Sequence, residues 1–254
     1  MADEPAKQKF DFFVYIMESP SAVDLYHSRS EGGRVAETLR LDGIPCVTRT
    51  AINLEAFGAA LRFGLPEVMK LFPDHYPIMH ISAHGAQTGI QLSSGETLTW
   101  TQLREFLVPI NASLEGALLL CMSACHGYSA CQMAMQEAEV PHPYFAMVGN
   151  CGMPLWSDTA VGYLTFYHLL AKGRSIPDAV EAMKAASGND DWGVETAENS
   201  KQGYLDFLKS QATPAEAQHQ LEVVAEMEPV PADAKALETG VRTGDQVVTG
   251  GSFG

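Results

Sequence analysis

Two side chains that can carry nucleophilic chemistry each stand at the end of an apolar run of strand length. Cys125 ends the run LLLCMSAC and precedes a histidine and a glycine, and His84 ends the run YPIMHISAH and precedes Gly85. A thiol can act as a nucleophile and an imidazole as a general acid or base. In open parallel sheets, ligands bind where the loops converge beyond the carboxyl ends of the strands. If the two strands are neighbours, the side chains of Cys125 and His84 could approach within contact or one-water distance, so we pair them as a candidate dyad.

The residues around the dyad favour a reactive thiol. A helix predicted over residues 129–140 would direct its N-terminus at Cys125, where backbone N–H groups and the helix dipole lower a thiol pKa. Gly85 has no Cβ, so a substrate could approach its backbone closely. The backbone N–H groups of Gly85 and Cys125 are therefore candidate donors to the oxyanion of an acyl-transfer intermediate.

Other interpretations of the cysteines stay open. A cysteine inside an apolar strand is commonly a core thiol, a description that fits Cys46 and Cys121 better than Cys125. Cys121 and Cys125 also have the spacing of one half of a structural zinc site, although no second Cys or His pair in the sequence supplies the other half. We expect no metal and no cofactor.

Two further histidines, His80 and His126, lie near the two candidate residues in the sequence. His80 lies on the same strand face as His84 at period two, and we predict that it is a hydrogen-bonded core group. His126 directly follows Cys125, but neighbouring residues at a strand end point in opposite directions. His84 is therefore the preferred partner of the thiol.

The elements that must position the dyad alternate between strands and helices. Predicted strands cover residues 12–17, 44–52, 76–85, 116–125 and 143–150, and helical patterns lie between them. This alternation indicates a parallel sheet covered by helices, an α/β fold. Thr99 with Gln102, and Ser175 with Asp178, match helix-capping patterns.

Composition restricts the partners and the compartment. The net charge of −15 disfavours a nucleic-acid or anionic-membrane surface and leaves basic partners or substrates as a weak inference. We find no signal peptide and no apolar run near the roughly 20 residues of a membrane span. Five cysteines without an export signal indicate a reducing compartment, so a cytoplasmic protein is expected.

The pattern weakens after Trp192. We assign residues 1–200 to the domain that contains His84 and Cys125, and residues 201–254 to an acidic tail that is partly helical or disordered. Residues 214–229 could form one amphipathic helix. The lone basic residues Lys235 and Arg242 make autoprocessing of this tail a weaker hypothesis.

The segments HISAHG and LLLCMSACHG resemble the caspase-like cysteine peptidases of clan CD, in which His-Gly and Ala-Cys each follow an apolar strand. Within the clan, the sequence is most similar to the CHAT family. The similarity extends to LTWTQLREFL, VGNCGMPLWSDTAVGYLTFYHLLAKG and SIPDAVEAMKAA, and together these segments cover about residues 76–187.

The resemblance implies a caspase-like three-layer α/β/α sandwich with Cys125 as nucleophile and His84 as general acid/base. The histidine need not hold the thiol as an ion pair, because it can protonate the leaving amine and then activate water. Many family members have an acidic residue and then Thr or Ser after the cysteine, where this chain has His126 and Gly127. The family is commonly fused to helical repeats, which this sequence lacks, so the resemblance implies a separate sensor or activator protein.

The resemblance also suggests where a substrate pocket lies. Trp156 and Asp158 follow the fifth predicted strand, and Ser19 and Ser21 follow the first. Asp158 could bind a basic substrate side chain, or it could cap the following helix.

The leading hypothesis is a cysteine endopeptidase of a bacterial regulatory or defence system that cleaves specific protein substrates. The alternative is a catalytically silent caspase-like module that recruits a partner.

Overall fold

The computed structural model describes residues 11–211, and most of the predicted acidic tail, including the expected helix at 214–229, lies outside these residues. The predicted domain boundary after residue 200 falls inside helix α8 (Ala197–Gln211). Because the chain divides into compact units at residue 210, this helix belongs almost entirely to the first unit.

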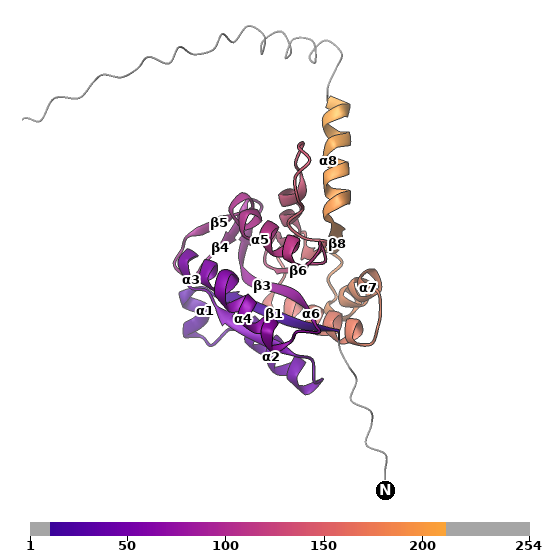
Figure 1. Cartoon of the computed structure of the whole chain (residues 1–254). Coiled ribbons are helices and arrows are strands. Elements are labelled where there is room, and N and C mark those ends of the chain that lie inside the picture. The colour runs from indigo at the N-terminus through magenta and orange to yellow at the C-terminus, as the bar shows by residue number, and fades with distance from the viewer. Residues whose placement is uncertain (1–10, 212–254) are drawn as a thin grey trace, which may run out of the picture. The chain divides into compact units, whose positions relative to one another are not determined.

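The centre of the fold is a mostly parallel sheet (Figure 1). Its strand order is β2-β1-β3-β6-β7-β8. The strands are β1 (Phe12–Ser19), β2 (Cys46–Thr50), β3 (Tyr76–Ala86), β6 (Leu119–Ser123), β7 (Ala146–Asn150) and β8 (Trp192–Thr196). The first five of these are parallel to their neighbours, and β8 runs antiparallel to β7. The short strands β4 (Gly89–Gln91) and β5 (Thr97–Thr99) extend the end of β3 as a hairpin.

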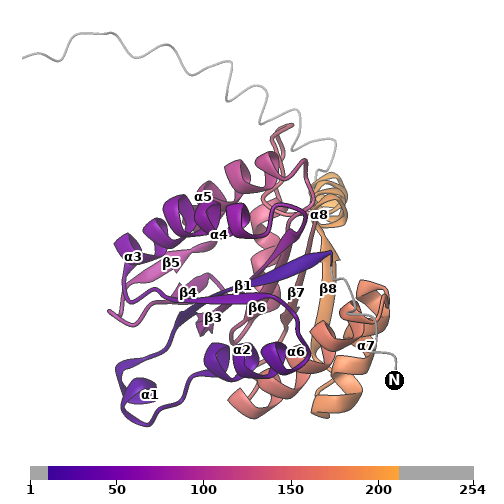
Figure 2. The same cartoon turned by 60° about the horizontal axis from the view of Figure 1, so that its bottom comes forward.

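Helices cover both faces of the sheet (Figure 2). One face packs against α2 (Glu31–Leu41), α6 (Trp156–Ala171) and α7 (Ile176–Ser187). The other packs against α3 (Leu54–Ala59), α4 (Leu65–Leu71) and α5 (Trp100–Ser113), with a π-helical turn over Ala60–Gly64 between α3 and α4. Burial on both faces explains why the strands read as continuous apolar runs. The predicted caspase-like α/β/α sandwich is confirmed in its layers and its mostly parallel sheet.

The local capping predictions are also confirmed. The Thr99 hydroxyl accepts a hydrogen bond from the backbone N–H of Gln102, whose side chain accepts one from the Thr99 N–H, so α5 begins with a complete capping box. The Ser175 hydroxyl accepts a hydrogen bond from the backbone N–H of Asp178 at the start of α7. Within residues 11–211, no helix has the length and apolarity needed to cross a membrane.

Three parts of the element prediction were wrong. The helix expected over residues 129–140 is a 3₁₀-helix over Gly127–Ala134. Its backbone packs directly against β7, where a Cβ at Gly149 would meet the Gly127 carbonyl carbon at 2.7 Å, and this contact holds the segment close to the sheet. The serine-rich loop after β1 contains a short helix, α1 (Ala22–Tyr26), and β8 and α8 follow the point where the sequence pattern weakens.

Candidate functional site

Strands β3 and β6 are neighbours, as the dyad requires. Their parallel register pairs Ser82 with Ser123. His84 and Cys125 each lie two residues beyond that pair, at the same level and at the same edge of the sheet. The predicted adjacency of the two residues is therefore confirmed at the level of the backbone.

Gly85 brings the end of β3 against the Cys125 backbone. A Cβ at this position would overlap the carbonyl oxygen of Cys125 and would lie 2.8 Å from the Cβ of Ala124. Gly85 is therefore required for the close approach of the two segments. Because Gly85 also pairs with Ile90 of β4, its role as an oxyanion donor stays a prediction.

Asp24 of α1 completes the site, and the sequence analysis missed it. Its Oδ2 lies 2.7 Å from Nε2 of His84, and its side chain is 7% exposed, against 42% for His84. The Ser21 hydroxyl donates a hydrogen bond to the Asp24 carboxylate and accepts one from the Asp24 N–H as the N-cap of α1. The Ser21-x-x-Asp24 spacing is itself a helix-start signal, which could have revealed this residue.

The charge of Asp24 decides the tautomer of His84. Burial raises the carboxyl pKa, but hydrogen bonds from Ser21 and His84 lower it more, so the pKa of Asp24 is below its ordinary value. An ionised carboxylate only accepts hydrogen bonds, so Nε2 of His84 carries the donated proton. In the neutral imidazole, Nδ1 is then left as the nitrogen that can accept a proton.

The dyad lines one cavity. A hollow of about 190 Å³ contains His84 and Cys125 together with residues from the ends of β3 and β6 and from the start of α6, namely Ala83, Ser123, Ala124, Pro154, Leu155, Trp156 and Thr159. The Trp156 ring meets the His84 ring edge-on, with centroids 5.6 Å apart. The thiol of Cys125 and the imidazole of His84 thus line the same cavity.

Comparisons with known proteins find distant structural likeness only. A scan against protein-family models finds no match, and a search of curated proteins finds none. Among solved structures, the Arg-specific cysteine proteinase gingipain R (RgpB) is similar with a TM-score of 0.42 and 11% identity, over 71% of this chain and 44% of that chain. The complex of the Porphyromonas gingivalis RgpB pro- and mature domains gives 0.47 and 13%, over 75% and 48%. The pyridoxal kinase from Staphylococcus aureus gives 0.36 and 8%, over 73% and 99%.

This chain spans less than half of the length of the two gingipain chains. At TM-scores below 0.5 and identities of 13% or less, these similarities concern a general α/β architecture only. Because no family model matches, membership of the CHAT family stays a prediction.

The expected activation of the thiol by a helix N-terminus is not found. Burial raises the pKa of Cys125 above its ordinary value, although its own backbone N–H acts in the opposite direction. The segment that follows is a 3₁₀-helix preceded by His126 in the left-handed region, rather than the predicted α-helix. Cys125 is therefore a neutral thiol at pH 7 that needs a base when it reacts.

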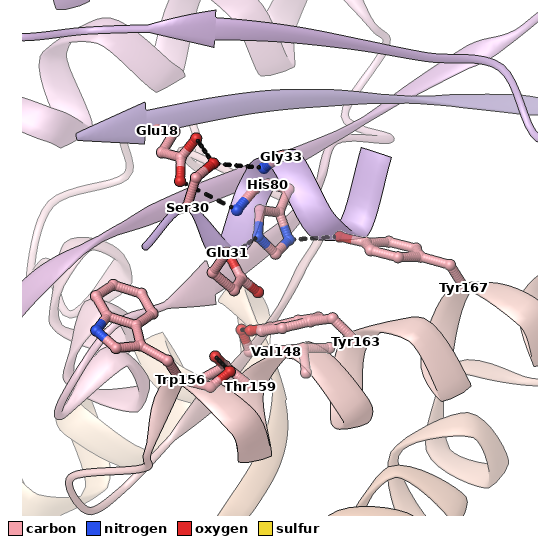
Figure 3. A network of polar contacts seen from close by, with 11 residues as sticks. Glu18, Ser30, Glu31, Gly33, His80, Val148, Trp156, Thr159, Tyr163 and Tyr167 are labelled. Atoms are coloured by element: carbon pink, nitrogen blue, oxygen red, sulfur yellow. Dashed lines mark hydrogen bonds and ion pairs between the residues drawn. The ribbon is translucent and has the colours of Figure 1, made fainter. Parts of the chain in front are cut away.

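The structure separates the other histidines from the dyad as predicted. Nδ1 of His126 lies 3.0 Å from the Cys151 carbonyl oxygen. His80 is fully buried, with Nδ1 2.8 Å from the Tyr167 hydroxyl and Nε2 3.1 Å from Glu31 (Figure 3). His80 is thus a hydrogen-bonded core residue beneath the site.

The core-thiol interpretation is confirmed for Cys121. It is fully buried in β6, and burial raises its pKa to about 12. Cys46 is half-buried and packs against the edge of the core. For the zinc alternative, the described residues contain no group of three or more Cys, His, Asp or Glu side chains placed to hold a metal ion.

The predicted pocket residues divide into two kinds. Trp156 lines the cavity, as expected. Asp158 instead accepts a hydrogen bond from the Leu155 N–H at 3.3 Å, and its side chain does not line the cavity. Ser19 is buried, and its hydroxyl accepts a hydrogen bond from the Ser93 N–H. Ser21 does not line the cavity, and its hydroxyl donates to Asp24. Asp158 therefore occupies the alternative role, that of a helix cap.

Replacing Gly85 with Ala is expected to lower the free energy of unfolding by about 2 kcal/mol or more, because the added methyl group overlaps the Cys125 carbonyl oxygen. Urea unfolding followed by circular dichroism measures the change. Gly203→Ala is the matched control, since an added Cβ there meets nothing within 4 Å. Equal urea midpoints for Gly85→Ala and Gly203→Ala would contradict the close contact between Gly85 and the Cys125 carbonyl oxygen.

The raised pKa of Cys125 predicts slow alkylation at neutral pH. The rate with iodoacetamide should still be rising at pH 9, the ordinary thiol pKa, because a raised pKa means that less than half of the thiol is ionised at that pH. Mass spectrometry of the peptide that contains Cys125 follows the reaction. A rate that levels off below pH 7 would show that the thiol is already ionised.

Proposed function

We propose that this protein is a cysteine endopeptidase that cleaves specific protein substrates through Cys125 and His84, with Asp24 as the residue that orients His84. The observation that supports it is one cavity lined by a thiol and an imidazole whose Nε2 lies 2.7 Å from a buried carboxylate. Assignment to the CHAT family of clan CD, a place in a bacterial regulatory or defence system and a separate activator protein belong to the same proposal.

In the proposed reaction, Nδ1 of His84 accepts the thiol proton as the Cys125 sulfur attacks the substrate carbonyl carbon. The tetrahedral intermediate collapses to a thioester, and His84 gives its proton to the leaving amine nitrogen. Water then attacks the thioester carbon while His84 accepts a proton from it. The acid product leaves, and the Cys125 thiol is restored with that proton.

Asp24 contributes in each of these steps without touching the substrate. Its carboxylate keeps the proton of the neutral ring on Nε2, and it stabilises the imidazolium that forms when Nδ1 is protonated. Asp24 is almost fully buried but 42% of the His84 side chain is exposed, so water screens this interaction in part.

The test uses the full chain and a fluorogenic peptide library, followed by candidate proteins encoded beside its gene. We expect cleavage by the wild-type chain and by Cys151→Ser, which changes an exposed cysteine outside the cavity. Cys125→Ala should lower kcat/KM by about 10⁴-fold or more. Unchanged cleavage by Cys125→Ala would contradict the proposal.

One observation favours the alternative, a catalytically silent module that recruits a partner. Burial raises the pKa of the Cys125 thiol, so the thiol is protonated at neutral pH. That function predicts no reaction of Cys125 with peptidyl electrophiles under any condition. Labelling that depends on the peptide sequence would exclude it.

A further inference from the structure

Helix α1 buries a charged side chain and exposes its apolar ones. Asp24 is the buried residue of this helix, whereas Val23, Leu25 and Tyr26 are 63%, 47% and 84% exposed. A surface helix ordinarily does the reverse, because its apolar side chains pack against the core. Figure 2 shows α1 set apart from the helices that cover the sheet. The apolar side chains of α1 are therefore available to another molecule.

A second exposed apolar segment follows β7. Met153 is 75% exposed and Leu155 is 68% exposed, and Leu155 also lines the cavity of the dyad. Exposed apolar surface is thus continuous with that cavity. Residues 151–157 carry no charge, and the one charged side chain of α1 is the buried Asp24. In a chain with a net charge of −15, both segments present an uncharged surface.

The strand order places these two segments on opposite sides of the dyad. In the series β1-β3-β6-β7, the carboxyl ends of the two central strands lead to His84 and Cys125. Helix α1 follows β1 on one side, and Met153 and Leu155 follow β7 on the other. Neighbouring strands are about 4.8 Å apart, so β1 and β7 are about 14 Å apart. An extended chain of about four residues covers this distance.

The molecule that covers both segments must also leave the thiol able to react. A polypeptide that lies across the carboxyl ends of these strands contacts α1, then His84, which Asp24 of α1 holds, and then the cavity wall at Leu155. A regulatory protein seated on both segments would cover the mouth of the cavity and exclude the substrate. The occupant that contacts both sides and permits the reaction is the segment that is cleaved.

We propose that Val23, Leu25, Tyr26, Met153 and Leu155, here called the apolar rim, bind an uncharged, apolar segment of the protein substrate. Because the dyad lies midway between the two halves of the rim, this segment has one large apolar residue about two positions before the scissile bond and another about two positions after it. Covering the rim removes apolar area from water on both molecules, which favours binding. This inference rests on the proposed peptidase function and adds the substrate class.

The experiment uses internally quenched peptides built on the core sequence that the fluorogenic library selects. They carry Leu, Asn, Lys or Glu at the second residue before and at the second residue after the scissile bond. For the wild-type chain, kcat/KM with Leu should exceed that with Asn by about 10-fold at each position. Peptides with Lys or Glu should be cleaved no faster than those with Asn, because the rim offers no charged partner.

Variants of the two halves of the rim identify which half contacts which position. Val23→Ser combined with Tyr26→Ser should reduce the preference for Leu to within about 2-fold at one position and keep it at the other. Met153→Ser should do the same at the opposite position. The ratio between Leu and Asn peptides is compared because a displaced Asp24 would slow the cleavage of all peptides alike. Leu41→Ser, which changes an 87% exposed residue at the far end of α2, is the matched control and should keep both preferences.

Binding of the same peptides to the Cys125→Ala chain, measured by fluorescence anisotropy, provides a readout that is independent of cleavage. The peptide with Leu at both positions should bind at least about 10-fold more tightly than the peptide with Asn. Tighter binding of the Leu peptide without any cleavage by the wild-type chain would contradict the proposed function and support the apolar rim as a peptide-binding surface. Cleavage without a preference for Leu, or with a preference for Lys or Glu, would overturn this inference and leave the proposed function intact.

A second copy of this chain is the competing occupant of the rim. In that case the wild-type chain should sediment as a dimer in analytical ultracentrifugation, and Val23→Ser combined with Tyr26→Ser should convert it to a monomer. Such a conversion, with the preference for Leu unchanged in the variant, would overturn the inference. A wild-type chain that sediments as a monomer and prefers Leu at both positions supports it.

Discussion

Replacing Asp24 with Asn should lower kcat/KM for peptide cleavage by about 10²- to 10⁴-fold without unfolding the protein. The carboxylate can only accept a hydrogen bond, so it keeps the proton of the neutral His84 ring on Nε2 and leaves Nδ1 free to take the thiol proton. An Asn amide can instead donate to Nε2, which moves the ring proton to Nδ1. The substitution also removes the negative charge that stabilises the imidazolium. Initial rates with a fluorogenic peptide measure the effect.

Asp42→Asn is the matched control for this change. Asp42 also forms a short Asp–His contact, 2.8 Å from Nδ1 of His168, but that pair is partly exposed and lies outside the cavity of the dyad. The control should cleave at the wild-type rate. Asp24→Asn activity within about 3-fold of wild type would exclude an orienting role for the carboxylate.

The pH dependence of stability provides a readout that does not depend on activity. Because the pKa of Asp24 is lower in the folded chain than its ordinary value of 3.8, its ionised form stabilises the fold above that pH. This contribution is lost as the pH falls through the lowered folded value. The free energies of unfolding of wild type and Asp24→Asn, measured in urea, should therefore differ at pH 7 and converge in strong acid. A difference in this free energy that does not change with pH would contradict the interaction assigned to the ionised Asp24 carboxylate.

The sequence predicts the parallel sheet and the dyad because both depend on local patterns. Apolar runs of strand length define the strands, and polar residues at their carboxyl ends define the edge where ligands bind. His84 and Cys125 could therefore be assigned without knowledge of the strand order. Their pairing required the β3–β6 register, which sequence alone left as an assumption.

Asp24 and Glu31 escaped prediction because their roles depend on long-range packing. Asp24 reaches His84 across 60 residues of chain, and Glu31 reaches His80 across 49. Both are acidic residues near the start of a helix, where a carboxylate is ordinarily a surface residue that interacts with the helix dipole. The packing of α2 on one face of the sheet and the contact of α1 with His84 near the end of β3 bury them.

The thiol pKa was predicted in the wrong direction for a related reason. A cysteine followed by a helical pattern resembles a helix N-terminus, but that segment is a 3₁₀-helix whose backbone at Gly127 packs closely against Gly149 of β7. Desolvation of Cys125 then dominates its pKa. A helix N-terminus lowers the pKa of a thiol, whereas desolvation raises it. Only the three-dimensional packing decides which effect is larger.

Replacing His80 with Leu is expected to lower the free energy of unfolding by about 3–5 kcal/mol, the largest stability effect that we predict. The imidazole lies 3.1 Å from Glu31 and 2.8 Å from the Tyr167 hydroxyl, and the side chains of His80 and Glu31 are fully buried. Without His80, neither Glu31 oxygen keeps a partner within residues 11–211. The cost arises from a buried carboxylate rather than from lost packing volume. Urea unfolding measures it.

A double-variant cycle distinguishes these two causes. If the unpaired carboxylate is responsible, adding Glu31→Met to His80→Leu should recover most of the lost stability, because the polar pair is then replaced by apolar groups of similar size. If lost packing is responsible, the second substitution should add its own cost. His142→Ala, which breaks an exposed contact with Glu198, is the control and should change stability by less than about 1 kcal/mol. A His80→Leu variant as stable as this control would show that the buried contact contributes little to the fold.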